Sequence, residues 1–297
     1  MLHFPVMLEE SVDFLINDLD GHYVDCTFGR GGHSKLILEK ISSKGHLSSF
    51  DKDPEAYAFG LNFKNDNFKI RHDSFKNLDK YFKDNSINGI IYDLGTCSTH
   101  LDNAERGFSF NKEGQLDMRF DNTVGEPFSE WLEKAKKEEI IEILYKFGDE
   151  KHARLIADAI IEIQKSTPIR TTLQLASLIK DVYPEKKLRI NPATKSFQAF
   201  RIFINNELNE FKESLEIAKR IIKKDGLIVV ISFHSLEDGI VKEFFKPTIK
   251  SFPKDIPLNS KEIKEFKCIA KKIKASSKEI TENPRSRSAI MRVFKKI

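Results

Sequence analysis

One stretch near the N-terminus, Tyr23 to His33 (YVDCTFGRGGH), constrains the fold more than any other. It starts as an apolar run typical of a buried strand and continues into Gly29, Gly31 and Gly32, before a helical pattern over residues 34–40. Glycine at such a turn permits a positive φ and lets a ligand approach the main chain closely. The stretch therefore predicts a cofactor-binding turn between a strand and a helix.

Asp51 supports this interpretation because it ends a second apolar run, HLSSFD, twenty residues beyond Gly31. In nucleotide-binding α/β sheets an acid at this offset accepts hydrogen bonds from ribose hydroxyls. The pattern GRGGH lacks the third glycine of the dinucleotide fingerprint and the lysine of a P-loop. S-adenosylmethionine, which has no pyrophosphate, is the nucleoside cofactor that remains. The alternative is that the glycines merely make a tight connection.

The rest of the chain alternates helical patterns with strands, which we expect at residues 68–72, 88–94, 226–233 and 289–294. Such alternation favours a parallel, doubly wound sheet with ligands outside the carboxyl ends of its strands. Residues 102–207 read instead as consecutive helices, which indicates an inserted helical domain. We therefore expect a first part of the α/β domain at residues 1–103, a helical insertion domain at 104–207, and a second part of the α/β domain at 208–297.

Several large apolar residues of the helical block are expected to form its core rather than to stack on bases: Trp131, Leu132, Phe197, Phe200 and Phe203. The segment between the last two expected strands is rich in lysine and contains Pro247, Pro253 and Pro257. We expect a long mobile loop there.

Charge is unevenly distributed along the chain. The net charge is +4, but residues 246–297 hold 15 Lys or Arg against five Asp or Glu. A basic segment of this size suggests nucleic acid as a partner, although a solvated lysine-rich surface is an equal alternative.

Composition excludes several other classes. Three cysteines without CxxC spacing argue against a disulfide framework and against a zinc site, and no metal is expected. No apolar run reaches the length of a membrane span, and the N-terminus is too acidic for a signal peptide. A cytoplasmic enzyme is therefore expected, as a monomer or a homodimer.

Asp93 is the first candidate for chemistry, because it ends the fourth expected strand in DLGTCSTH. In methyltransferases that act on exocyclic amines of bases, an acid at this strand end accepts hydrogen bonds from the amino group. The lone pair of such an amine is delocalised into the ring, and acceptors around its hydrogens favour a more nucleophilic nitrogen. The alternative is that Asp93 is only a structural cap at the end of the strand. Cys97 is interpreted as a small buried cysteine rather than a nucleophile, and His234 as either a base or a structural residue. Arg285 and Arg287 are expected to contact phosphates.

A series of motifs then points to one family. HFPVML, TFGRGGHS, FDKDP, DLGTCS with LDNAERGFSF, GQLDMR, NPATKSFQAFRIFIN, ISFHSLED and NPRSRSA occur in this order. They resemble the bacterial 16S ribosomal RNA cytosine-N4 methyltransferases, the RsmH or MraW family, over nearly the whole chain.

The resemblance implies an α/β class I S-adenosylmethionine-dependent methyltransferase fold (Rossmann-like, doubly wound sheet) with an inserted all-helical domain. It also implies methylation of N4 of a cytidine in the decoding centre of the small ribosomal subunit, at the position customarily numbered 1402. The implied partner is the small subunit with its 16S rRNA.

The resemblance also implies roles for individual residues. Asp93 and Ser98 would be catalytic. The implied cofactor contacts are Gly31, Gly32, His33, Asp51, Phe75, Asp93 and His100. The implied RNA contacts are Lys195, Arg201, His234, Arg285 and Arg287.

This chain departs from the family pattern at several of these places. DLGTCSTHLD stands where the family typically has DLGVSSPQLD, so His100 replaces a glutamine that contacts the cofactor. Two alternatives follow. The chain could be an inactive ribosome-binding assembly factor on the same fold, or a methyltransferase acting on a DNA amino group.

Overall fold

The computed structural model describes residues 5–183, 191–249 and 262–297. The chain divides into two compact units, an α/β unit formed by Met1–Gly95 with Leu208–Ile297, and a helical unit formed by Thr96–Glu207. This division places Thr96–Glu207 in the helical unit, whereas the sequence pattern predicted an insertion at residues 104–207.

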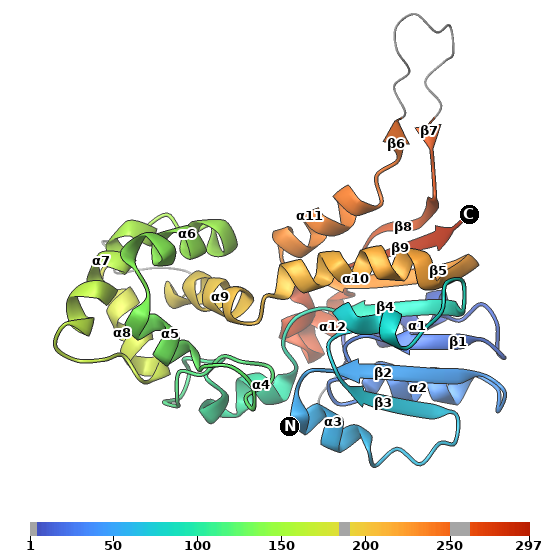
Figure 1. Ribbon diagram of the computed structural model, residues 1–297, viewed down its shortest axis with the longest axis horizontal. Helices are drawn as coiled ribbons and strands as arrows, with labels where there is room; N and C mark the ends of the chain where they lie inside the picture. Colours follow the sequence, from blue (N-terminus) through green and yellow to red (C-terminus); the bar gives the residue numbers. More distant parts are fainter. Residues whose placement is uncertain (1–4, 184–190, 250–261) are drawn as a thin grey trace, which may run out of the picture. The chain divides into compact units, whose positions relative to one another are not determined.

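The α/β unit is built on one seven-stranded sheet with the strand order β3-β2-β1-β4-β5-β9-β8 (Figure 1). β1 pairs in parallel with β2 and β4, and β2–β3 and β4–β5 are also parallel. β9 runs antiparallel to both β5 and β8. This arrangement confirms the predicted doubly wound α/β fold.

The elements of the α/β unit that precede the helical unit are α1 (Leu8–Leu15), β1 (His22–Asp25), α2 (Gly32–Lys40), β2 (His46–Asp51), α3 (Pro54–Gly60), β3 (Phe68–His72), the 3-10 helix η1 (Phe75–Lys80) and β4 (Ile87–Asp93). Those that follow are α10 (Glu207–Ile221), β5 (Ile222–Ser232), α11 (Ser235–Phe244), β6 (Thr248–Ile249), β7 (Glu262–Ile263), β8 (Phe266–Lys274), α12 (Ser277–Glu282), η3 (Pro284–Ser288) and β9 (Ile290–Lys296).

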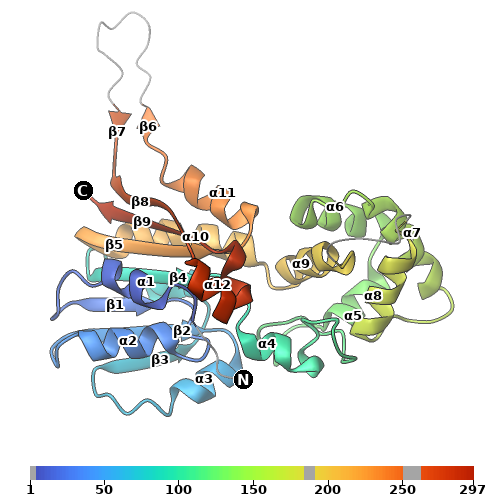
Figure 2. The same ribbon diagram turned by 180° about the vertical axis from the view of Figure 1, so that it is seen from behind.

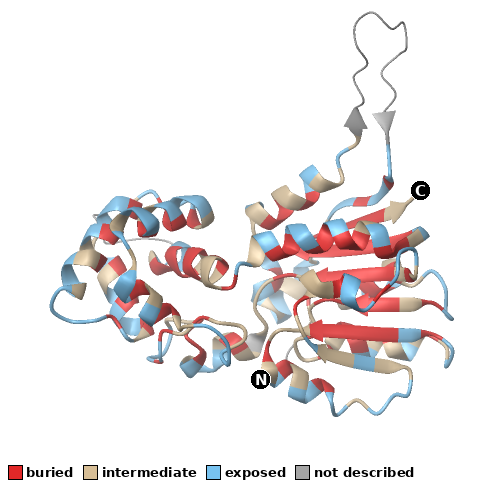
Figure 3. Cartoon of the chain, viewed as in Figure 1, coloured by how far each residue is buried: buried red, intermediate tan, exposed pale blue. Residues whose placement is uncertain are grey.

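Helices cover both faces of the sheet. Phe211 and Leu215 of α10 and Val241 of α11 pack on one face, together with Leu78 of η1. α1 and α2 pack on the other face, which Figure 2 shows from behind. The central strands are consequently buried along most of their length (Figure 3), because apolar side chains from both faces exclude water.

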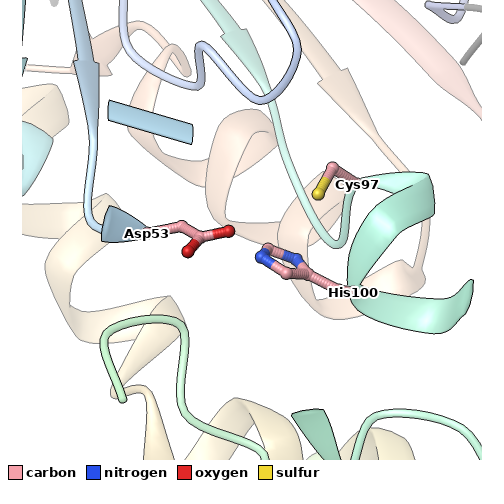
Figure 4. Close-up of side chains that lie close together, drawn as sticks. All are labelled: Asp53, Cys97 and His100. Atoms are coloured by element: carbon pink, nitrogen blue, oxygen red, sulfur yellow. The ribbon is translucent and has the colours of Figure 1, made fainter. Parts of the chain in front are cut away.

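Local signals explain how the helices next to the strand ends begin. Asp53 caps α3 by accepting a hydrogen bond from the Glu55 amide at 3.0 Å, and Pro54 occupies the first helical position (Figure 4 shows the Asp53 carboxylate). A capping aspartate followed by proline is a strong signal for the start of a helix. The aspartate accepts a hydrogen bond from a backbone N–H of the first turn, and proline has no N–H that would need a partner.

The helical unit contains α4 (Ser98–Asp102), the 3-10 helix η2 (Ala104–Arg106), α5 (Phe128–Lys134), α6 (Lys137–Gly148), α7 (Ala153–Gln164), α8 (Thr172–Asp181) and α9 (Ala193–Ile204). The expectation that its large apolar residues form a core is confirmed. Leu132, Phe197 and Phe200 are buried, and Trp131 and Phe203 pack against them. Among the described residues, no helix combines the length and the apolar character needed to cross a bilayer.

One structural expectation was wrong. The lysine-rich segment is not one long loop, since β8 occupies Phe266–Lys274 and α12 occupies Ser277–Glu282. Two register shifts interrupt the alternation of β8, which hid the strand in the sequence pattern. Pro253 and Pro257 lie outside the described residues.

Candidate active site

The glycine turn, Asp51 and Asp93 all lie at the carboxyl edge of the parallel strands. β1 sits between β2 and β4, so the turn that follows it is held by both neighbours. The amide of Gly29 donates to Oδ2 of Asp51 at 2.7 Å, and the amide of Asp93 donates to Oγ1 of Thr27 at 2.8 Å. The structure therefore brings together three of the predicted features.

Glycine is required at Gly31 by both conformation and space. Its φ is +73°, and a Cβ there would lie 2.6 Å from Cζ of Phe63 and 2.8 Å from Cζ of Phe28. Any larger residue would strain the backbone and displace two aromatic rings. The next residue, Gly32, begins α2.

Asp51 uses both carboxylate oxygens to shape the adjoining loops. Besides the bond from Gly29, its Oδ1 accepts a hydrogen bond from the Asp53 amide at 2.9 Å. These two bonds orient the Asp51 carboxylate, and a carboxylate is the kind of acceptor that ribose hydroxyls require.

In the described part of the chain, one carboxylate oxygen of Asp93 lacks a hydrogen-bond partner. This oxygen, Oδ1, is buried. Burial first, and then the negative charges of Asp25, Glu237 and Glu279, raise the pKa of Asp93 well above its ordinary value. A carboxyl group in this state favours either a proton or a cationic ligand beside it.

His33 lies next to Asp93, with its Nδ1 3.8 Å from Asp93 Oδ2. Its Nε2 donates to the Val6 carbonyl at 3.2 Å, because a carbonyl can only accept. Burial lowers the pKa of His33 to about 4, so the ring is neutral at neutral pH and does not neutralise Asp93.

Asp25 is a site residue that the sequence reasoning missed. It ends β1, is buried, and accepts hydrogen bonds from the Thr27 amide at 3.1 Å and from Oγ of Ser34 at 2.7 Å. Burial raises its pKa to about 6. The signal was present in the sequence, since an acid within a buried apolar run is rare unless it is paired or has a function.

Glu210 of α10 was also missed, because only the tertiary structure brings it to the site. Its buried carboxylate lies 3.1 Å from Nζ of Lys52 and of Lys76, and accepts a hydrogen bond from Oγ of Ser74 at 2.8 Å. Lys52 follows Asp51, and Ser74 and Lys76 flank the predicted cofactor contact Phe75. Glu210 therefore joins the two loops that carry Asp51 and Phe75.

Phe75 itself begins η1, with two residues between it and the end of β3. Its ring packs edge-to-face on Tyr92, with 5.8 Å between ring centroids. Packing against a buried residue of β4 fixes the direction of this ring.

His234 is held by the helix that it starts. Its Nδ1 accepts a long hydrogen bond from the Glu237 amide at 3.5 Å, and its Nε2 lies 3.0 Å from Oε1 of Glu237. The other oxygen of Glu237 accepts from the Phe233 amide at 2.7 Å. The structure thus gives His234 a capping function, in addition to the RNA contact implied by the resemblance.

The other two predicted residues near DLGTCSTH belong to the helical unit. His100 is buried and stacks on Phe108, with ring centroids 4.9 Å apart. Figure 4 shows Cys97 beside it, with Sγ and a ring nitrogen of His100 within 4.8 Å. The side chain of Ser98 lies outside what the structure describes.

Cys97 differs from its interpretation as a buried, inert thiol. It is half-buried, and although burial raises the pKa of its thiol, hydrogen bonding with His100 and the charge of that ring outweigh burial, so the pKa is lowered.

Two predicted RNA contacts of the helical unit lie on or near α9. Lys195 donates to the Asp149 carbonyl at 3.0 Å and keeps half of its side chain exposed. Arg201 forms a two-pronged ion pair with Glu207, at 2.8 and 2.9 Å. Arg201 is therefore held in place by an acid of the same unit.

The last two predicted RNA contacts, Arg285 and Arg287, lie on η3 immediately before β9, and both are exposed. Ile290, the first residue of β9, pairs with Ser232 at the carboxyl end of β5. Both arginines therefore lie near the edge of the sheet that carries Asp93.

Comparison with known proteins adds an independent line of evidence. The family model described as "MraW methylase family" matches residues 1–297. "Ribosomal RNA small subunit methyltransferase H" of Marinomonas sp. is 43% identical over 304 residues, covering 99% of this chain and 97% of the relative. The protein of the same name from Idiomarina loihiensis is 42% identical over 305 residues, with 99% and 97% covered. Among solved structures, a putative methyltransferase from Streptococcus mutans in complex with SAH is similar at a TM-score of 0.44 and 11% identity, with 100% of both chains covered.

Proposed function

Because this chain belongs to the MraW methylase family, we propose that it methylates N4 of a cytidine in the decoding centre of small-subunit ribosomal RNA. Its methyl donor is S-adenosylmethionine. Relatives that match nearly the whole chain are named as methyltransferases of small-subunit ribosomal RNA, which supports the partner. The same proposal places the enzyme in the cytoplasm, with the small subunit as its substrate.

The observation that carries the proposal is the buried, unsatisfied Oδ1 of Asp93 beside the glycine turn. A cytosine amino group has two N–H donors and a lone pair delocalised into the ring. An acceptor at Oδ1 engages one of those hydrogens and favours a nitrogen with a more available lone pair. The raised pKa of Asp93 suits this role, because a carboxylate with high proton affinity accepts a hydrogen bond strongly.

The residues at this edge also fit the methyl donor. When bound, S-adenosylmethionine supplies an electrophilic methyl group on a positively charged sulfur. Asp25 is buried and Asp93 partly buried, both have raised pKa values, and a cation beside them offsets their mutual repulsion. Asp51 would accept from the ribose hydroxyls, Phe75 would contact the base, and Gly31 and Gly32 would allow the main chain to approach the donor.

The remaining predicted residues complete the proposal. His33 would orient Asp93 without adding charge, and Ser98 and His100 would contribute from the helical unit. Lys195, Arg201, His234, Arg285 and Arg287 would contact the RNA, with the helical unit recognising its structure. Arg201 would do so through its position on α9, since its guanidinium already pairs with Glu207.

The test is a methyl-transfer assay with 30S subunits from a strain that lacks the modification. Labelled S-adenosylmethionine is supplied, the rRNA is digested, and its nucleosides are separated and identified. We expect label only in N4-methylcytidine from the decoding centre. Label in another nucleoside would refute the proposed position, and absence of label with normal cofactor binding would indicate an inactive assembly factor. Duplex DNA as the acceptor tests the third alternative.

A further inference from the structure

Exposed lysines form a row along β8, the outermost strand of the sheet. Lys267, Lys271, Lys272 and Lys274 are all exposed, and within the described ranges none of them forms an ion pair. Acids of the same unit pair elsewhere, for example Glu265 with Lys219 and Asp225 with Lys295. The row therefore presents four uncompensated positive charges on one strand, and we call it the β8 lysine row.

Two irregularities in the pairing of β8 expose adjacent lysines. The register with β9 shifts between Cys268 and Ala270 and again between Ala270 and Ile273. In a regular strand neighbouring side chains point to opposite faces, whereas Lys271 and Lys272 are both exposed here. A bulge of this kind re-aims side chains at a sheet edge.

A buried arginine holds this bulge in place. Arg292 of β9 donates through one guanidinium nitrogen to the Lys271 carbonyl. Its other nitrogens pair with the carboxylate of Asp238 at 2.6 and 3.1 Å. The main chain under Lys271 is therefore fixed by charged hydrogen bonds.

The pairing register connects the lysine row to the candidate active site. Lys274 pairs with Ile290, Ile290 pairs with Ser232, and Ile231 pairs with Asp93. Lys274 thus lies at the same edge of the sheet as Asp93, three strands away, which is about 14 Å at ordinary strand spacing. From there the row runs along β8 towards Lys267, away from the site.

Protection of the sheet edge does not account for this placement. Lysines on an edge strand discourage pairing with other chains. The opposite edge strand, β3, has the same need but carries a single exposed lysine, Lys69. Its arginine, Arg71, lies over the rings of Phe50 and Tyr81. Of the two edge strands, β8 therefore carries the greater concentration of exposed lysines, and α12 connects it to the helix η3 that bears Arg285 and Arg287.

We propose that the β8 lysine row binds the sugar-phosphate backbone of the ribosomal RNA that flanks the target cytidine. This inference rests on the proposed function, because the RNA must present its target at the edge that carries Asp93. Ammonium groups on a strand neutralise phosphates and release counterions, and they do so without reading base identity. The β8 lysine row therefore contributes affinity for the RNA and sets the direction in which its backbone leaves the candidate active site, while that site selects the base.

The test uses the full-length variant Lys267→Gln/Lys271→Gln/Lys272→Gln/Lys274→Gln, which removes the charges and keeps the edge polar. Binding to unmodified 30S subunits is measured across a range of salt concentrations. A plot of the logarithm of the association constant against the logarithm of the salt concentration has a negative slope. The magnitude of this slope should decrease by about 3, since each of the four phosphate contacts contributes about 0.7 on a single strand. The KM for 30S subunits should rise at least about tenfold at low salt, whereas the Kd for S-adenosylmethionine should change less than about twofold.

A matched control removes four exposed lysines elsewhere on the α/β unit, Lys44, Lys64, Lys69 and Lys83. It has the same net charge as the first variant but keeps the β8 lysine row. Equal losses of affinity for 30S subunits in the two variants would show an effect of net charge only and would overturn the proposal. An unchanged salt slope in the β8 variant would overturn it as well. The double variant Lys271→Gln/Lys272→Gln should give about half of the slope change of the quadruple variant. A melting temperature close to that of the wild type shows that the double variant is folded. A wild-type enzyme that never methylates 30S subunits would instead refute the proposed function.

Discussion

Two carboxylates of the α/β unit, the partly buried Asp93 and the buried Asp238, lie in opposite electrostatic surroundings. Asp238 of α11 pairs with Arg292 and Lys242, and these hydrogen bonds outweigh burial, so its pKa is lowered. Among the described residues, Asp93 has acids around it and no cationic partner, and its pKa is raised. Asp238 therefore stabilises the fold at neutral pH, whereas Asp93 carries an electrostatic cost that a cationic ligand can relieve.

The largest expected effect is on catalysis at Asp93. Asp93→Asn keeps the shape of the side chain but removes its charge and exchanges one acceptor oxygen for a donor. We expect kcat on 30S subunits to fall by about 10²–10³-fold, the size of losing one well-placed electrostatic contact in an active site. Single-turnover methyl transfer measures it. Activity within threefold of wild type would mean that Asp93 does not contact the amino group.

The second prediction concerns Asp238→Asn. Removing one partner of a buried ion pair leaves Arg292 uncompensated, so the free energy of unfolding should fall by about 3 kcal/mol at neutral pH. Urea denaturation measures this. The pKa of Asp238 is lower in the folded than in the unfolded state. Its contribution to stability is therefore fully present above the pKa of the unfolded state and is lost as pH falls through the pKa of the folded state. The difference from wild type should therefore shrink on acidification; a constant difference would contradict the ion-pair explanation.

The third prediction separates cofactor binding from general stability at Glu210. Glu210→Gln removes the negative charge between Lys52 and Lys76, and the loops bearing Asp51 and Phe75 lose their common anchor. We expect the Kd for S-adenosylmethionine to rise about tenfold, or 1.4 kcal/mol, with kcat at saturating cofactor within about twofold. Isothermal titration calorimetry provides the affinity.

Asp238→Asn is the matched control for this experiment, since it also removes a buried acid that joins two elements. It should leave cofactor affinity nearly unchanged. Similar weakening in both variants would assign Glu210 a purely structural role.

The smallest expected effect completes the comparison of the two acids. Without cofactor, Asp93→Asn should raise the melting temperature at neutral pH, because it removes a buried charge that the fold disfavours. The folded pKa is raised, so the cost to wild type is absent below the unfolded value of about 4 and grows as pH rises towards the folded value. The gain should therefore vanish near pH 4. A gain that is equal at all pH values, measured by scanning fluorimetry, would exclude this electrostatic origin.

Particular elements show how far sequence reasoning extends. The bounds of β2 and β3 were predicted as the structure has them, because turn-forming residues flank short apolar runs. β8 was missed, since its bulges break the alternation that identifies a strand. Asp25 could have been found from its position in a buried run. Glu210 could not, because it lies more than a hundred residues from Lys52 and Ser74 in the chain.

The sequence by itself determined the doubly wound sheet, the glycine turn and the acid at the end of each neighbouring strand. These features follow from local spacing, and parallel strands bring their carboxyl ends to one edge whatever the remaining contacts. Only the tertiary structure decided which acids are satisfied. Pairing depends on which distant side chains reach the same buried volume, as Arg292 reaches Asp238 and no cation reaches Asp93 in the part of the chain described. The difference between a paired carboxylate such as Asp238 and an unpaired oxygen such as Oδ1 of Asp93 is therefore a property of the folded chain.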